Sequence, residues 1–401
     1  MKSRGTLILS AMLLVMLGVC YTWATWQFFT RPIPGGNDFL THYGAWQAYW
    51  RDGVSPYSDA AALNTQRAIY GRLALPGEDQ NRMVYPFYSI LIHGPFALIE
   101  DYALARAVYM TVSQIALLIG VVMCVRLFRW KPSVGLLAGV LAWTLLYYHD
   151  ARGVLIGQFA ILAFGALAVG LVLLQQKQDT WAGVALAFTT IKPTLVFLVV
   201  PFLLGWCLVR RRWNFAVGFL AALTVVGIGS FIALPTWFGD WVYRVLQYTG
   251  YTQNQSPVWT IAQMGPIVTF IYLGALALLL LWSWRQSFYS GDDHELYWAL
   301  GLTLVVSNLV SPRAATTDYV LMLVPTLGFF AALDRAPRWG RFTLVALMLG
   351  SMVGLWALHL ATVQGDWEQW QMYLPWPLAL LAIWILGRRW LITSWRNLVH
   401  A

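Results

Sequence analysis

Residues 180–209 read TWAGVALAFTTIKPTLVFLVVPFLLGWCLV, an apolar run that is interrupted by Lys192-Pro193 and followed by three arginines. This run is too long for one ordinary transmembrane helix and too short for two, at about 20 residues each. A single pass would place Arg210, Arg211 and Arg212 outside, against the usual excess of basic residues on the cytoplasmic side. We therefore predict two short passes that meet at Lys192-Pro193, where irregular backbone is tolerated inside protein or beside a wet cavity.

The rest of the chain has the same hydrophobic character. Hydrophobic residues make up 59% of the sequence and charged residues 11%, whereas a soluble domain carries about 25% charged residues. The recurring apolar runs predict an all-α polytopic membrane protein with about 12 transmembrane helices. We place these helices near residues 6–29, 103–125, 133–149, 154–174, 180–191, 193–209, 213–235, 264–284, 295–311, 315–333, 342–363 and 372–387. The first run is longer than a signal-peptide core and lacks a cleavage site, so we expect it to be retained.

The charged residues predict the orientation of these helices. With the N-terminus inside, the cytoplasmic segments hold 16 of the 26 basic residues and five of the 17 acidic ones. The net charge is then +11 inside and −2 outside, which is the positive-inside pattern. We therefore predict that both termini are cytoplasmic and that residues 30–102 lie outside. Because topology accounts for the basic excess, we expect no nucleic-acid partner.

Residues 30–102 form a long polar and aromatic loop after the first span. Ser58 or Asp59 can cap a helix that continues to about Leu73. The apolar side of this helix is expected to carry Leu63, Ile69, Tyr70 and Leu73. The apolar run that ends at Ile99 has about a dozen residues, which is typical of an interfacial or re-entrant segment. We expect one membrane domain, residues 1–401, with this loop and residues 236–263 folded on to its outer face.

Asp38 is the first candidate for chemistry. It follows the flexible Gly35-Gly36 pair, about nine residues beyond the first span. A carboxylate at this outer position can act as a general base that deprotonates an acceptor hydroxyl while a sugar carbon is attacked. The alternative is a helix N-cap, a position that Asp and Asn favour.

Lys192 is the second candidate. A lysine at membrane depth is costly and is usually functional, and the phosphate of a lipid carrier is one partner that suits it. The alternatives are a side chain that snorkels to the outer interface or an ion pair with an acid such as Asp150. Arg313 and Arg152 fall near the outer ends of predicted spans, and a guanidinium suits phosphate because of its planar donors. For both arginines a salt bridge at the rim is the alternative.

The histidines give a weaker signal. His42 lies one helical turn after Asp38, so the two side chains can share a helix face. The spacing suggests no third ligand, so support for a divalent metal is weak and we expect no cofactor. The sequence also contains no nucleotide-binding glycine loop and no nucleophile elbow. This fits an active face outside the cytoplasm, where activated sugars arrive on lipid.

Several short motifs occur together in a characteristic order. They are Asn37-Asp38-Phe39, Asp52-Gly53-Val54-Ser55-Pro56-Tyr57, Val84-Tyr85-Pro86, Gly157-Gln158, Ile191-Lys192-Pro193 and Asn308-Leu309-Val310-Ser311-Pro312. In this order the chain resembles the polyprenyl-phosphate-dependent mannosyltransferases of glycosyltransferase family 87, a resemblance that spans most of residues 1–330.

The resemblance implies a GT-C-type fold with its catalytic centre at the outer face of a bacterial inner membrane. It implies inverting transfer of a sugar, usually mannose, from a polyprenyl-phosphate carrier to a lipid or glycan acceptor. The family's catalytic aspartate corresponds to Asp38, and its Lys-Pro motif to Lys192-Pro193. One departure is that Asp38 stands between Asn37 and Phe39, whereas many GT-C enzymes carry paired acids here, which weakens any metal requirement.

We therefore predict a glycosyltransferase with Asp38 as the base and with Lys192, Arg313 and Arg152 on the carrier phosphate. The side chains expected to bind substrate are His42, Tyr43, Trp46, Tyr85 and Gln158. The partners are the lipid-linked donor, the acceptor and membrane lipids. The alternative from another class is a transporter or flippase of lipid-linked glycans, which would use the same basic groups without a carboxylate base.

Overall fold

A computed structural model describes residues 4–75, 78–251, 256–365 and 368–397. The protein is an all-helical polytopic membrane protein of a GT-C-like kind, as the sequence predicts. Six of the described helices are long and apolar enough to span a membrane, or eight if each of two bent helix pairs counts as one span. A total of about 12 requires shorter apolar helices such as Val134–Leu146 and Val199–Val209 to cross as well, and that count stays a prediction.

The described residues group into two compact units. The single membrane domain expected from the sequence stays a prediction. Unit 1 comprises residues 1–115, 154–158 and 230–252, and unit 2 comprises residues 116–153, 159–229 and 253–401. Three helices run from one unit into the other, and they are α5 (Tyr102–Leu127), α7 (Tyr148–Ile156) and α12 (Trp213–Ala233).

Unit 1 contains residues 30–102, the loop predicted to lie outside. Its remaining elements are α1 (Arg4–Thr25), η1 (Trp26–Thr30), α2 (Asn37–Asp52), α3 (Asp59–Tyr70), η2 (Phe87–Ser89), α4 (Ile90–Ala97) and α13 (Trp237–Tyr251). Helix α13 packs on η2, and its Trp241 Nε1 donates to the carbonyl of Val84 at 2.9 Å. The buried Arg244 Nε donates to the carbonyl of Tyr57 at 2.7 Å. Helix α13, which opens the second predicted outer loop, is therefore fixed on the first such loop.

Helix α3 confirms the predicted cap and corrects the predicted face. The Ser58 hydroxyl accepts a hydrogen bond from the Ala61 amide, and the helix ends at Tyr70. The residues buried on it are Ala61, Ala62, Thr65 and Gln66. The expected apolar side was wrong, since Leu63 is only partly buried and Leu73, 45% exposed, lies beyond the helix. Small residues face inward because α2 packs closely against α3.

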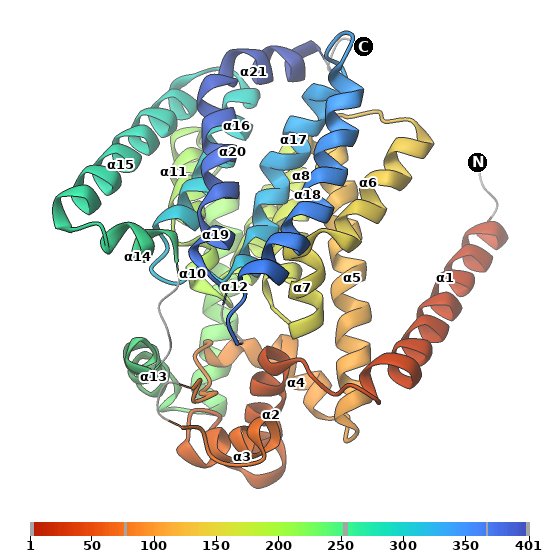
Figure 1. Cartoon of the computed structure of the whole chain (residues 1–401), viewed down its shortest axis with the longest axis vertical. Coiled ribbons are helices and arrows are strands. Elements are labelled where there is room, and N and C mark those ends of the chain that lie inside the picture. The colour runs from red at the N-terminus through yellow and green to blue at the C-terminus, as the bar shows by residue number, and fades with distance from the viewer. Residues whose placement is uncertain (1–3, 76–77, 252–255, 366–367, 398–401) are drawn as a thin grey trace. The chain divides into compact units, whose positions relative to one another are not determined.

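Unit 2 is a helical bundle. Its remaining elements are α6 (Val134–Leu146), α8 (Ala160–Gln175), α9 (Asp179–Thr189), α10 (Pro193–Val196), α11 (Val199–Val209), α14 (Pro257–Ala262), α15 (Pro266–Tyr289), α16 (Asp293–Val310), η3 (Thr316–Met322), α17 (Leu323–Leu333), α18 (Gly340–Thr362), α19 (Trp370–Tyr373), α20 (Pro375–Leu386) and α21 (Arg388–Asn397). Helices α8, α16 and α17 are buried along almost their whole length, as expected of helices that are apolar on every side. Figure 1 shows α16 and α17 within the bundle and α15 at its edge.

Two contacts fix the bundle around α16 and α9. The Trp298 and Trp384 indole N–H groups each donate to the other's backbone carbonyl at 2.9 Å, which joins α16 to α20. A side chain at Gly183 of α9 would collide with the backbone of α12, and one at Gly218 of α12 would collide with α9. Glycines therefore let α9 and α12 approach closely, as small residues do in membrane helix packing.

The structure confirms the predicted break at Lys192-Pro193. Helix α9 ends at Thr189 and α10 begins at Pro193, with Lys192 as its N-cap residue. A second break at residues 197–198, which the sequence analysis does not predict, separates α10 from α11. The spans expected at residues 133–149 and 154–174 are also different, because α7 is a separate short helix bent by 120° from α8. Hydropathy reports which residues are apolar and not the direction of the chain.

Candidate functional site

Asp38 lies in the first turn of α2 in unit 1. The N-cap residue is Gly36, whose φ of 75° places it in the left-handed region, so the N-cap alternative for Asp38 is wrong. The Asp38 side chain is partly exposed. Because the N-terminus of a helix carries a partial positive charge, this position favours an ionised carboxylate.

Gln158 is the partner of Asp38 within unit 1. Its side-chain amide donates a hydrogen bond to Asp38 Oδ2. Gly157 makes this contact sterically possible, because its φ is 83° and a Cβ atom there would press against the backbone and Cβ of Phe39. The Gly157-Gln158 pair therefore brings a neutral donor to the carboxylate, from a position 120 residues further along the chain.

Arg106 fixes the turn before α2. This guanidinium, 4% exposed, donates to the carbonyls of Ile33 and Pro34 at 2.8 and 2.6 Å and to the carbonyl of Leu155 at 2.7 Å. A side chain at Gly36 would reach within 2.5 Å of Arg106 Nε, so glycine is required there. The arginine thus joins the turn before Asp38 to the end of α7 just before Gln158. The sequence analysis does not identify this residue.

Aromatic side chains support α2 from within unit 1. Phe39 is fully buried and stacks on Tyr109 with ring centroids 4.6 Å apart. The His42 ring lies 4.2 Å from the ring of His93 and 4.3 Å from that of Tyr85. His93 is fully buried, and this burial lowers its pKa to about 3. The residues behind Asp38 are therefore held by packing of aromatic and imidazole rings.

Three of the predicted sugar-binding aromatics lie in this packed layer. Trp46 is fully buried between Tyr49 and Phe87. The Tyr43 hydroxyl donates to the carbonyl of Ile99 at 2.7 Å, and burial raises the pKa of this phenol. Tyr85 is also buried. Their contacts are structural, and the roles of Tyr43, Trp46, Tyr85 and His42 in binding substrate stay predictions.

Lys192 in unit 2 forms a buried ion pair. Its Nζ atom lies 2.5 Å from Asp318 Oδ1, and the two side chains are 13% and 3% exposed. The other Asp318 oxygen accepts from the backbone amide of Ala315 at 3.2 Å, at the start of η3. The alternative that Lys192 pairs with Asp150 is wrong, since Asp318 is the acid that reaches it. Asp150 is itself fully buried in α7.

Arg152 is also paired with an acid in unit 2. Its Nη1 atom lies 2.9 Å from Glu368 Oε1, and Glu368 is 3% exposed. Glu368 also accepts hydrogen bonds from the hydroxyls of Thr316, at 2.6 and 2.7 Å, and Tyr148. Because Tyr148 and Arg152 are four residues apart on α7, they share one helix face. The resulting network joins α7, η3 and the segment before α19.

Arg313 lies in the turn between α16 and η3. The Ser311 hydroxyl donates to the Arg313 carbonyl at 2.9 Å, and the Ser256 hydroxyl donates to that of Pro312 at 3.2 Å. The Arg313 side chain is partly buried. The Ser311-Pro312-Arg313 stretch is therefore a fixed turn five residues before Asp318.

Unit 2 thus collects the predicted basic residues around one element. Lys192 reaches η3 through Asp318, Arg152 reaches it through Glu368 and Thr316, and Arg313 precedes it in the chain. The sequence analysis does not assign Asp318 or Glu368 a role. An acid inside an apolar run is a signal that could have identified Asp318, because the span Thr316–Leu333 is otherwise uncharged.

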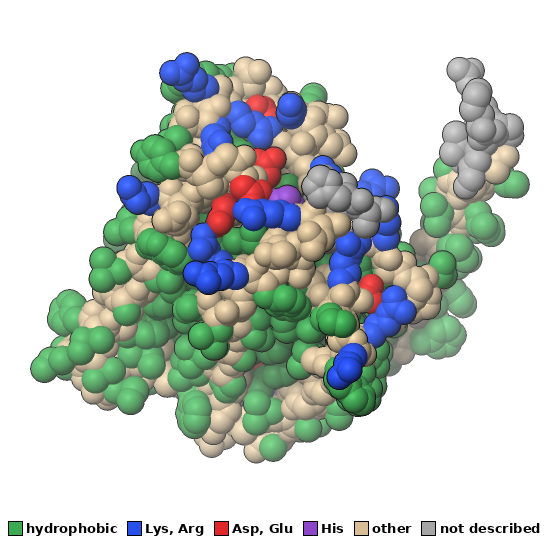
Figure 2. Space-filling view, turned by 90° about the horizontal axis from the view of Figure 1, so that it is seen from above, with side chains coloured by type: hydrophobic (Ala, Val, Ile, Leu, Met, Phe, Trp, Pro, Cys, Tyr) green, Lys and Arg blue, Asp and Glu red, His purple; other side chains and the backbone are tan. Residues whose placement is uncertain are grey.

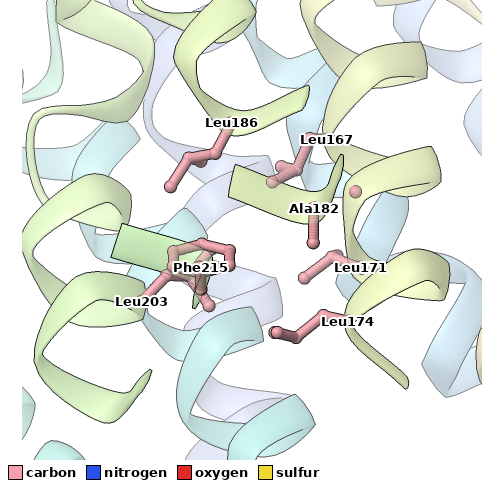
Figure 3. Close-up of a pocket in the computed structure, with 8 residues that line it drawn as sticks. Leu167, Leu171, Leu174, Ala182, Leu186, Leu203 and Phe215 are labelled. Carbon is pink, nitrogen blue, oxygen red and sulfur yellow. The ribbon is translucent and has the colours of Figure 1, made fainter. Parts of the chain in front are cut away.

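A small ligand elsewhere in the protein would need a hollow or a metal-ligand cluster to hold it. The hollow in Figure 3 lies among α8, α9, α11 and α12, is lined only by apolar residues and has a volume of about 10 Å³. It is too small and too apolar for a sugar. Within the described ranges, no three His, Cys, Asp or Glu side chains come together as metal ligands would.

A comparison with known protein families finds a match. The sequence pattern of Glycosyltransferase family 87 matches residues 84–312, which is more than half of the 401-residue chain. The candidate residues inside the match are Tyr85, Arg152, Gln158 and Lys192. Asp38 precedes it, and Arg313 is the first residue after it. No curated protein matches the chain.

Proposed function

The chain belongs to glycosyltransferase family 87, and from that premise we propose that it transfers mannose from a polyprenyl-phosphate carrier to a lipid or glycan acceptor. The transfer proceeds with inversion at the sugar carbon and takes place at the outer face of a bacterial inner membrane. The observation that carries this proposal is the position of Asp38 in the first turn of α2, with the Gln158 amide on one of its oxygens.

Asp38 acts as the general base in this proposal. The acceptor hydroxyl gives its proton to the carboxylate while its oxygen forms a bond to the anomeric carbon of the sugar. The bond between that carbon and the phosphate oxygen breaks, and polyprenyl phosphate leaves with the bonding electrons. Inverting transfer needs a single carboxylate, and the helix N-terminus and a neutral amide support an ionised one.

The carrier phosphate is assigned to the basic groups of unit 2. Lys192, Arg152 and Arg313 supply three positive charges around η3, of which two are paired with Asp318 and Glu368. A guanidinium binds phosphate through two parallel hydrogen bonds, which suits Arg313 and Arg152. The phosphate joins or replaces the carboxylate partners when the donor binds.

A transporter of lipid-linked glycans would need the basic groups but no base. Membership of a glycosyltransferase family and the hydrogen-bonded Asp38 carboxylate both favour an enzyme over a transporter. The two functions differ in what they require at residue 38, since a transporter should tolerate an isosteric amide there.

The test is sugar transfer by purified wild type, Asp38→Asn and a control, Asp52→Asn. Asp52 is the exposed last residue of the same helix. We expect Asp38→Asn to lower transfer by about 10²–10⁴-fold because it removes a general base, and Asp52→Asn to leave it unchanged. Thermal unfolding of both variants checks folding.

The donor class is tested in the same assay with polyprenyl-phosphate-linked mannose and with a nucleotide-linked mannose. Transfer from the lipid-linked donor alone is the expected result. A folded Asp38→Asn protein with wild-type transfer would remove Asp38 from catalysis, and transfer from the nucleotide sugar alone would overturn the proposed donor.

A further inference from the structure

Unit 2 contains a second cavity, at the end of the bundle where α5 and α8 terminate. Its volume is about 250 Å³, and polar and apolar residues line it together. The lining residues are Leu127, Phe128, Arg129, Gln175, Lys177, Asp293, His294, Tyr297 and Trp395. None of them belongs to the candidate site described above. The predicted topology places this end of the bundle in the cytoplasm.

Most acidic residues at this end are already paired with an arginine. The pairs are Asp179 with Arg212, Asp292 with Arg396, Glu295 with Arg388 and Asp334 with Arg341. Figure 2 looks down on this end and shows many basic side chains with a few acidic ones among them. Arg129 and Lys177, by contrast, form no ion pair within the part of the chain that the structure describes. The cavity wall also holds the carboxylate of Asp293, so its two cations exceed its acidic side chains by one charge.

The backbone at both cations is unusual. Arg129 has a φ of 48° and Lys177 a φ of 62°, and each lies two residues past the end of its helix. Glycine is the usual residue in this left-handed position, because a side chain there is sterically disfavoured. Arg211 and Arg338 share this conformation at other helix ends and do not line the cavity. The conformation alone is therefore no site, but here both residues that adopt it line one cavity.

Other polar groups in the cavity lining are held in place by hydrogen bonds. Gln175 Nε2 donates to the Tyr297 hydroxyl at 2.9 Å and to the carbonyl of Leu127 at 3.0 Å. His294 Nδ1 lies 2.7 Å from Asp292 Oδ1. This contact orients the imidazole and does not use its second ring nitrogen, Nε2. The cavity thus combines two cations with one carboxylate, an imidazole, a phenol and the rings of Phe128 and Trp395.

We propose that this cavity binds a phosphate group, carried by an anionic lipid headgroup or free in solution. Two cations with an oriented imidazole match the charge and the acceptor oxygens of a phosphate. Basic pockets between transmembrane helices at the cytoplasmic face recognise such headgroups. The site is separate from sugar transfer and holds even if the proposed function fails.

Thermal unfolding of the full-length protein in a neutral detergent tests the site. The probes are phosphatidylglycerol, phosphatidylcholine and inorganic phosphate at constant ionic strength. The cavity variant is Arg129→Gly with Lys177→Gly, and the control variant is Arg211→Gly with Arg338→Gly. Glycine suits all four backbone positions, so both variants should fold, and each loses two positive charges from the same face.

We expect phosphatidylglycerol or inorganic phosphate to stabilise the wild type and phosphatidylcholine to have less effect; which of the two anions acts identifies the source. The cavity variant should need about 25 times more of that probe, since each basic residue near the surface contributes about fivefold. The control variant should match the wild type. Equal losses in both variants would assign the effect to the charge of the whole face, and an absence of stabilisation by either anion would overturn the site.

Discussion

Asp38 in unit 1 and Lys192 in unit 2 meet partners of opposite kinds. The carboxylate of Asp38 accepts a hydrogen bond from the neutral amide of Gln158. The ammonium of Lys192 lies against the carboxylate of Asp318, and Arg152 lies against Glu368 in the same way. The amide orients its carboxylate without cancelling the charge, whereas each carboxylate in unit 2 neutralises its cation.

This difference matches what each role requires. A general base must keep its negative charge to accept a proton, so a neutral donor is a suitable partner. A buried charge is costly unless it is paired, so Lys192 and Arg152 need acids when no phosphate is bound. The two regions should therefore respond differently when a partner is removed, and the following predictions test that contrast.

The largest effect is expected for Asp318→Asn. Removing one member of a buried ion pair leaves an uncompensated charge, which costs about 3–5 kcal/mol of stability. The control is Glu100→Gln, which breaks an exposed pair with Arg51, in which Glu100 is 88% exposed, and should cost less than about 1 kcal/mol. Chemical unfolding in detergent measures both.

The double variant Lys192→Met with Asp318→Leu sharpens the test. Because it removes both charges, it should recover much of the stability that Asp318→Asn loses. Equal stability of Asp318→Asn and Glu100→Gln would mean that the buried Lys192–Asp318 pair stabilises the protein no more than an exposed ion pair does.

Gln158→Leu is expected to have a smaller effect, and on activity. A hydrogen bond to a charged group contributes about 1.5–3 kcal/mol, or roughly ten- to hundredfold in rate if it acts at the catalytic step. Gln158→Glu should lower transfer at least as much, because it places a second carboxylate beside Asp38. The control is Gln47→Leu, which removes an amide that binds the Tyr43 hydroxyl on the same helix. If Gln158→Leu transferred sugar at the wild-type rate, the Gln158 amide would have no part in supporting the Asp38 carboxylate.

Local features of the fold follow from the sequence. The apolar runs predict most of the helices, the Lys-Pro pair predicts the break at Lys192, and Ser58 predicts the start of α3. Each of these depends on residues that are close in the chain. The extra break at residues 197–198 and the 120° bend between α7 and α8 depend on packing, which hydropathy does not report.

The partners at the site depend on residues far apart in the chain. Asp38 is the predicted residue, but its contact with Gln158 spans 120 positions, and the contact between Lys192 and Asp318 spans 126. The sequence suggests Asp150 as one partner for Lys192, because both are predicted to lie toward the outer side, and the fold selects Asp318 instead. Glu368 was missed because nothing in its neighbourhood distinguishes a buried carboxylate from an exposed one.

Gly157→Ala tests the steric basis of the Asp38 contact. The left-handed backbone and the close approach to Phe39 should together cost about 1–3 kcal/mol. Gly53→Ala is the matched control, because Gly53 also has a positive φ, of 64°, but nothing lies within 4 Å of its added Cβ. The difference in unfolding free energy between the two variants isolates the contact with Phe39. Identical values would show that this contact places no constraint on α2.

The smallest effect concerns the pH dependence of stability. It tests the buried His93 ring of unit 1, in contrast to the ion pairs of unit 2. Burial lowers the pKa of His93 to about 3, below the value of about 6.5 for an exposed histidine. A group whose pKa is lower in the folded state gives stability that is complete above pH 6.5 and is lost as the pH falls toward 3. Acidification from pH 6.5 to 5.5 should therefore cost about 1 kcal/mol through this residue. His93→Phe should remove that part of the slope, and the protection factors for hydrogen exchange in α4, which correct for the slower intrinsic exchange at lower pH, should fall on acidification in the wild type but not in the variant. If the unfolding free energy of both proteins changed equally with pH, another group and not His93 would control the acid sensitivity.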